Sequence, residues 1–264
     1  MPTFDAKLYR LNSQDLRHLD DRALESHFDR HGGKERRVFS RTETTAELMS
    51  MRWLRGRGIE IGAGRNPTPL FGDATCVHAD ISSATSFGGS AQYILDLGRT
   101  PAETVGEFDF AIAAHVLEHC DSFIRGLSNL LSAVNEKGAV YVVLPDKRYL
   151  FDQNWLPDFD FDHHLAEWRD PLANADMHDR LFLGSLTTDV RFNEHAEFSD
   201  ELAEALERRE LPADQRFLAH KHNYRFSDWI RLVDQSLTAM QSPFRIEDCA
   251  FGRERMDCHF ILAR

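Results

Sequence analysis

The sequence has few cysteines and lacks long apolar runs. Its 264 residues include four cysteines, none of them in a C-x-x-C pair: Cys76, Cys120, Cys249 and Cys258. This spacing predicts neither a disulfide framework nor a zinc cluster. No stretch approaches the roughly 18 apolar residues of a membrane-spanning helix, and residues 1–30 contain no apolar core of a secretion signal. We therefore expect a cytoplasmic protein without a membrane span.

The chain also has fewer positively charged residues than negatively charged ones. The chain has 31 Lys and Arg against 43 Asp and Glu, a formal net charge of -12. A field that attracts phosphate backbones is not expected, so nucleic acid is a disfavoured partner. The length and the 42% hydrophobic content suit one sizeable core, which predicts a single α/β domain with a substantial insertion.

The apolar pattern divides the chain. Residues 1–55 are polar with helical spacing and predict an N-terminal helical cap, followed by a main domain over residues 56–264. From residue 58 onward, short apolar runs alternate with helical segments, as in βα units on a parallel sheet. We expect strands at about 58–62, 75–80, 91–95, 109–114 and 139–144, and a crossover helix over 122–135. Two final runs, 244–251 and 256–262, predict an antiparallel hairpin.

Residues 146–225 interrupt this pattern. The segment is rich in His, Asp, Phe and Trp, with one polar helix expected around 199–209. It is too long for a plain connection, so it predicts a substrate-binding insertion that covers the carboxyl edge of the sheet as a lid.

A glycine loop follows the first expected strand. Gly62 and Gly64 allow the backbone to approach a ligand at the carboxyl end of that strand. Sixteen residues past Gly64, Asp80 ends the second strand, where a carboxylate can accept hydrogen bonds from both ribose hydroxyls. The spacing predicts a nucleoside site.

The neighbouring residues indicate which nucleoside. A dinucleotide oxidoreductase would need a third glycine where Pro67 stands. Glu60, within the strand, suits a cationic ammonium and sulfonium better than a diphosphate. The charge therefore favours S-adenosylmethionine.

Five segments of the chain, taken in order, resemble class I methyltransferases. They are residues 60–64, Asp80, 95–97, 108–119 and 138–145. The resemblance covers about residues 56–146 and the final hairpin. It implies a Rossmann-like fold with a mostly parallel seven-stranded sheet, a C-terminal antiparallel hairpin and a lid inserted after strand five. It also implies that residues 62–64 line the methionine moiety, Asp80 holds the ribose, Asp96 with Leu97 meets the adenine, and His115 lines the cofactor. The full set of expected cofactor residues is Glu60, Gly62, Ala63, Gly64, Asn66, Asp80, Ile81, Asp96, Leu97 and His115.

Residues 144–152, His163-His164 and 220–222 carry a narrower likeness. They are similar to methyltransferases that accompany glycosyltransferases in surface-polysaccharide pathways. The chain departs from that pattern at residues 155–160 and 223–225, which puts the acceptor in doubt.

Methyl transfer to a hydroxyl needs a general base, and imidazole suits that role. The candidates are His220 and His222, with His164 and Asp146 as alternates. Lys147, Arg148 and Tyr224 are candidate acceptor-binding residues. The spacing of His115, Glu118 and His119 also suits a metal, but the resemblance explains His115 without one, so we expect no metal.

The expected function is O-methylation of a carbohydrate or another small polar acceptor. One alternative is N- or carboxyl-methylation of a natural product, which needs no strong base. Another is a non-catalytic binding protein that keeps the cofactor fold. A homodimer is an open expectation.

Overall fold

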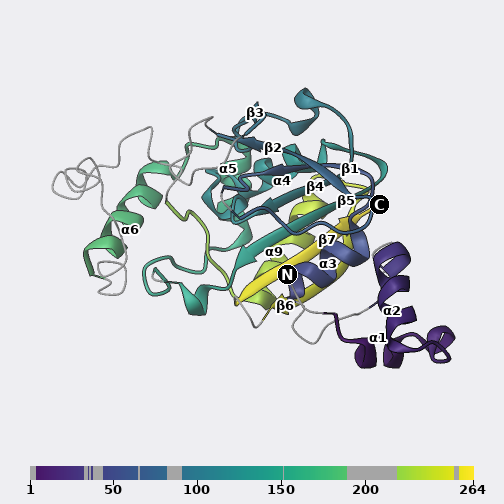
Figure 1. The fold of residues 1–264 in the computed structure, drawn as a ribbon. Helices are drawn as coiled ribbons and strands as arrows, with labels where there is room; N and C mark the ends of the chain where they lie inside the picture. The colour runs from purple at the N-terminus through teal and green to yellow at the C-terminus, as the bar shows by residue number, and fades with distance from the viewer. Residues whose placement is uncertain are drawn as a thin grey trace.

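The computed structural model describes residues 4–32, 35, 37, 44–64, 66–81, 91–150, 152–188, 219–252 and 256–264. A seven-stranded sheet in the order β3-β2-β1-β4-β5-β7-β6 forms its centre (Figure 1). The strands are β1 Arg57–Ile61, β2 Thr75–Asp80, β3 Tyr93–Ile94, β4 Phe108–Ala114, β5 Val134–Pro145, β6 Arg245–Gly252 and β7 Asp257–Ala263. The first five are parallel, and β7 runs antiparallel to both β5 and β6. This confirms the predicted Rossmann-like α/β fold, with a mostly parallel seven-stranded sheet and a terminal antiparallel hairpin.

Side chains of the central strands alternate between two cores. Ala111 and Ala113 of β4 face a cluster that includes Phe123 and Leu127 of α4 (Phe123–Leu131) and residues of α9 (Phe226–Ala239). On the other face, Phe110 and Ile112 pack with residues of α3 (Thr45–Trp53). Successive side chains of a strand point to opposite faces of the sheet. When both faces are buried, the sequence of the strand is therefore one continuous apolar run.

The N-terminal residues form short helices at one side of the sheet (Figure 1). They are α1 Ala6–Asn12, α2 Asp21–His27, the 3-10 turn η1 Gln14–Leu16 and the π-helical turn η2 Phe28–Gly32. Tyr9, Leu16 and Leu24 pack against Met51 of α3, which gives this segment a small core of its own.

The described parts of the insertion are also helical. They contain the 3-10 turn η5 (Lys147–Tyr149), α5 (Phe161–Arg169) and α6 (Ala175–Thr188), and α6 lies far from α1 and α2 in Figure 1. The helix expected around 199–209 falls outside the described residues. Among the ranges given above, no helix has the length and apolarity required to cross a membrane.

Two predicted elements need correction. The crossover helix ends at Leu131, and Val134 already pairs with Phe108 in the sheet. A short apolar run fits a helix face and a buried strand equally well, and pairing with β4 decides between them. The third strand is only two residues long, and it lies at the sheet edge with Ile94 59% exposed. No helix follows the glycine loop over residues 66–74, where Pro67 and Pro69 disfavour one.

Candidate functional site

The strand register brings the predicted cofactor residues to one edge of the sheet. Ile61 of β1 lies beside Ala79 of β2 and Ala113 of β4. Gly62, Asp80 and His115 therefore come at or just beyond the carboxyl ends of adjacent parallel strands. The chain order reverses between β1 and β4, which is where open α/β sheets bind their ligands.

The glycine loop depends on left-handed backbone. Gly62 has φ 72° and Gly64 has φ 54°, and a Cβ added at Gly62 would lie 2.4 Å from Cγ2 of Val116. The backbone N–H of Gly62 donates to the carbonyl of Ala79 at 2.9 Å, which fixes the loop beside the end of β2. Both glycines are thus required by conformation, and Gly62 by close packing as well.

Glu60 of β1 is hydrogen-bonded to Thr68, a residue that follows the glycine loop. Its carboxylate is 1% exposed and accepts hydrogen bonds from the N–H of Thr68 at 2.9 Å and the hydroxyl of Thr68 at 2.7 Å. Burial raises the pKa of Glu60, and the Thr68 hydrogen bonds oppose the rise. The Glu60 carboxylate therefore ties the end of β1 to Thr68, beyond the glycine loop.

Asp80 and Asp96 stand at the ends of neighbouring strands. Asp80 accepts from the N–H of Ile81 at 2.7 Å, and partial burial raises its pKa. Asp96 accepts from the N–H of Gly98 at 3.0 Å, which holds the turn after β3, while Leu97 is buried. Of the other expected cofactor residues, Ala63 is half-buried within the loop, and Asn66 and Ile81 are exposed.

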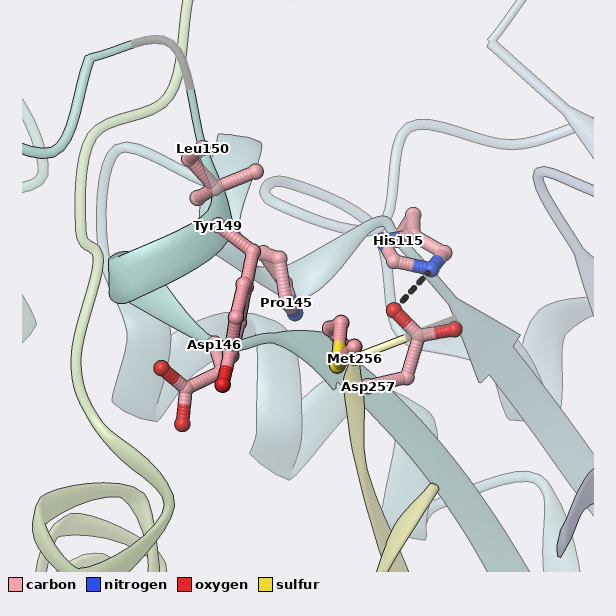
Figure 2. Close-up of a pocket in the computed structure, with 7 residues that line it drawn as sticks. All are labelled: His115, Pro145, Asp146, Tyr149, Leu150, Met256 and Asp257. Carbon is pink, nitrogen blue, oxygen red and sulfur yellow. Dashed lines mark ion pairs between the residues drawn. The ribbon is translucent and has the colours of Figure 1, made fainter. Parts of the chain in front are cut away.

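A cavity of about 290 Å³ opens between the end of β5 and the terminal hairpin, and His115 is the one expected cofactor residue in its lining. Figure 2 shows its lining, which consists of His115, Pro145, Asp146, Tyr149, Leu150, Met256 and Asp257. His115 has φ 57°, a rare conformation for a residue with a side chain, and it points toward the hairpin.

His115 is paired on both ring nitrogens. Nδ1 lies 3.3 Å from Glu118 Oε1, and Nε2 lies 3.4 Å from Asp257 Oδ1. Burial alone would lower the pKa of His115, but the two carboxylates outweigh it and raise the pKa to about 10. A protonated imidazole therefore lies at the mouth of this cavity at neutral pH.

One predicted base has the arrangement that the role requires. Nδ1 of His220 lies 2.8 Å from Oδ2 of the buried Asp152, whose other oxygen accepts from Asn223 Nδ2 at 2.8 Å. The His220 ring lies 4.8 Å from the ring of His119, and the N–H of Lys221 donates to the carbonyl of Glu118. These contacts bring His220 just beyond the carboxyl end of β4, close to Glu118 and His119.

Asp146 does not have the surroundings of a base. Its carboxylate is buried and binds the Arg148 guanidinium at 2.8 and 2.9 Å, as well as the N–H of Phe226 at 3.1 Å. Burial would raise the pKa of Asp146, but these donors outweigh it and lower the pKa. Figure 2 shows the carboxylate directed away from His115 and Asp257. Both carboxylate oxygens of Asp146 therefore already accept hydrogen bonds from other parts of the chain.

Three other predicted site residues also lie elsewhere than expected. His222 is 0% exposed and bonds Glu167 at 2.9 Å, and burial lowers its pKa to about 4. His164 is buried as well, with its Nε2 2.7 Å from the hydroxyl of Tyr224. Tyr224 is 4% exposed. All three side chains are buried: His164 and His222 lie beside Glu167, and Tyr224 packs in the main core against Trp229.

The two basic candidates remain near the surface. Lys147 Nζ pairs with Asp158 at 2.6 Å, and the guanidinium of Arg148 is 48% exposed, stacked over Tyr149 and Phe251.

Comparison with known proteins gives only remote likenesses. No family model and no curated protein matches this chain. Among solved structures, it is similar to one described with the Zn-dependent alcohol dehydrogenases of Rhodobacter sphaeroides (14% identity, 82% of this chain, 86% of that chain, TM-score 0.41). It is also similar to mitomycin 7-O-methyltransferase (12% identity, 95% and 60%, TM-score 0.40). A third is magnesium protoporphyrin IX methyltransferase from Synechocystis PCC 6803 with bound SAH (11% identity, 93% and 100%, TM-score 0.38). The chain spans about half the length of several further methyltransferase structures, 53% and 52% in two of them.

Sequence reasoning missed three acidic residues. Asp257 forms an ion pair with His115, and Asp152 is hydrogen-bonded to His220. Glu167 contacts the buried histidines, among them His222. The spacing of His163, His164 and Glu167 on one helix was a usable signal for Glu167. Asp257 gave none, because only the register of the hairpin brings it to His115.

Proposed function

We propose that this chain binds S-adenosylmethionine at the carboxyl ends of β1, β2 and β3 and transfers its methyl group to a hydroxyl of a carbohydrate or similarly polar acceptor. The observation that carries the proposal is the convergence of the left-handed glycine loop with Asp80 and Asp96 at one sheet edge. The two carboxylates suit the hydroxyls and amine of an adenosine.

The backbone after the loop also supports a nucleoside over a dinucleotide. Dinucleotide sites place the diphosphate at the N-terminus of the helix that follows the glycines. Residues 66–74 form no helix here, so that anion site is missing from this part of the described chain.

When bound, S-adenosylmethionine supplies an electrophilic methyl carbon, and the chain's task is to orient the acceptor and remove its proton. His220 is the base that we infer, with Asp152 fixing the ring so that the opposite nitrogen can take the hydroxyl proton. Arg148, half exposed at the surface near Tyr149, supplies a donor for an acidic sugar or phosphate group.

Calorimetry tests the cofactor. We expect S-adenosylmethionine and its demethylated product to bind, nicotinamide dinucleotides not to bind, and Asp80→Ala to weaken binding at least tenfold. Asp73→Ala, on the exposed turn before β2, is the matched control. Binding of a dinucleotide alone would overturn the assignment.

Labelled S-adenosylmethionine tests the acceptor. The protein is incubated with nucleotide sugars, surface-glycan extracts and amine or carboxylate natural products, and the label is located by mass spectrometry. Label on a glycan hydroxyl supports the proposal, and label on an amine or carboxylate replaces it with the second candidate. Tight binding without methyl consumption across the panel indicates a non-catalytic protein.

A further inference from the structure

Glu167 is surrounded by four histidines inside the insertion. We call His163, His164, Glu167, His178 and His222 the Glu167 cluster. The carboxylate is 0% exposed, and one ring nitrogen each of His163, His178 and His222 lies 2.8, 2.7 and 2.9 Å from it. The proposed methyl transfer uses none of these side chains.

Local structure fixes the cluster. His163, His164 and Glu167 share one face of α5, since helix residues three and four apart are neighbours. The ring of Phe159 stacks on His163 with centroids 3.9 Å apart, and the backbone N–H of His222 donates to the carbonyl of Glu118. Contacts outside the cluster therefore help to hold His163 and His222 in place.

The tautomer of His164 leaves an unsatisfied acceptor beside an anion. The Tyr224 hydroxyl donates to the carbonyl of Phe159 at 3.2 Å, so it accepts its 2.7 Å hydrogen bond from Nε2 of His164. A neutral imidazole with its proton on Nε2 has a bare lone pair on Nδ1. This Nδ1 is buried, has no hydrogen-bond partner and lies 3.9 Å from Oε2 of Glu167. Two facing acceptors repel each other unless a cation lies between them.

His163 presents a second buried nitrogen to the carboxylate. Its Nε2 lies 2.8 Å from Oε1 of Glu167 but lacks hydrogen-bond geometry, so it too counts as a buried nitrogen without a hydrogen-bond partner. The amide of Asn174 lies 3.1 Å from Nδ1 of His163. The Nδ2 atom of that amide also donates to Oε1 of Glu167 at 3.2 Å, so Nδ1 of His163 is the acceptor and the ring proton is on Nε2. Binding of a metal at Nε2 would therefore release that proton.

From these contacts we propose that a divalent metal ion, zinc by its donor set, binds among His163, His164, Glu167 and His222. Their four ligand atoms lie within 4.8 Å of one another. Imidazole nitrogen and carboxylate oxygen are zinc ligands, and a buried set of four is typical of a closed structural site. His178 stays hydrogen-bonded to the carboxylate and orients it.

Such an ion would join two parts of the insertion. His163, His164 and Glu167 come from α5, whereas His222 comes from the segment that also carries His220 and Tyr224. The metal would therefore fix the segment that presents the inferred base, without contacting an acceptor. This inference stands whether or not the chain transfers methyl groups.

Elemental analysis of the protein purified without a metal-affinity tag tests the site. We expect about one zinc per chain in the wild type and loss of most of it in Glu167→Gln and His222→Ala. His220→Ala, two residues from His222 and outside the cluster, is the control and should retain zinc. The same variant shows whether zinc binds at the Glu167 cluster or at the group formed by Glu118, His119 and His220. Equal loss in His220→Ala would overturn the placement.

A measurement on the wild type avoids dependence on variants that fold poorly. Zinc X-ray absorption should show three nitrogen ligands and one oxygen ligand at roughly 2.0–2.2 Å, and cobalt should give the strong visible absorption of a tetrahedral ion. Removal of zinc with a chelator should lower the Tm by about 5 °C or more. Less than about a tenth of a metal per chain after growth with added zinc, with no Tm response to zinc, would disprove the inference.

Discussion

Nε2 of His115 lies 3.4 Å from Oδ1 of Asp257, so the turn after β4 is tied to the first residue of β7. Residues from the middle and the end of the chain thereby form one wall of the cavity in Figure 2. The pair has a direct consequence for the dependence of stability on pH.

Asp257→Asn should lower the pKa of His115 from about 10 toward the usual imidazole value, because one of its two carboxylate partners becomes neutral. The folded chain holds the proton more tightly than the unfolded chain. The stabilisation is therefore complete below about pH 6.5 and disappears as pH rises toward 10. We expect the variant to have a lower Tm than the wild type at pH 6 and nearly the same Tm at pH 10. A Tm difference that stays constant over this range would contradict the pairing.

Asp152→Asn tests the orientation of His220. The amide cannot stabilise the charged ring, so under the proposed function kcat should fall by at least about 100-fold. The KM for S-adenosylmethionine should change by less than about threefold, because Asp152 contacts His220 and Asn223 and is not one of the expected cofactor residues. Asp162→Asn, on the exposed first turn of α5, is the control. A larger effect on KM than on kcat would argue against a positioning role.

Thr68→Val tests the support of the glycine loop. The substitution keeps the shape of the side chain but removes the 2.7 Å hydrogen bond to the buried carboxylate of Glu60. Urea unfolding should show a loss of about 1–3 kcal/mol in the free energy of unfolding. Thr104→Val removes an exposed hydroxyl that donates to the carbonyl of Pro101 and should cost less than about 0.5 kcal/mol. Similar losses in both variants would show that Glu60 does not depend on Thr68.

Asp146→Asn should act on stability and not on the pH profile of the reaction. The variant loses the paired hydrogen bonds to Arg148 and weakens the acceptor for the N–H of Phe226. Because the Arg148 side chain is half exposed, solvent screens the pair, and we expect a loss of about 1–2 kcal/mol at pH 7 from the buried hydrogen bonds of Asp146. Because the folded pKa of Asp146 is lowered, its contribution is present at neutral pH and declines below about pH 4. The loss should therefore shrink in acid unfolding experiments. A shift of the kcat profile without loss of stability would restore Asp146 as the base.

The order of elements could be predicted from the chain because burial on both faces leaves a continuous apolar run for each inner strand, as in β1 and β4. The glycine loop could be predicted as well, since left-handed backbone at Gly62 and Gly64 restricts the residue type. The boundary between α4 and β5 could not, because Val134 satisfies either periodicity until β4 pairs with it.

Sequence by itself thus determined the sheet and the edge at which Gly62, Asp80 and Asp96 meet, since parallel strands necessarily bring their carboxyl ends together. Only the tertiary structure decided which polar side chains are buried and with whom. Packing of the insertion placed His164 and His222 around Glu167, left His220 with Asp152, and brought Asp257 to His115. A titratable side chain acquires its role from such long-range partners and from its access to water, and neither is encoded in local spacing.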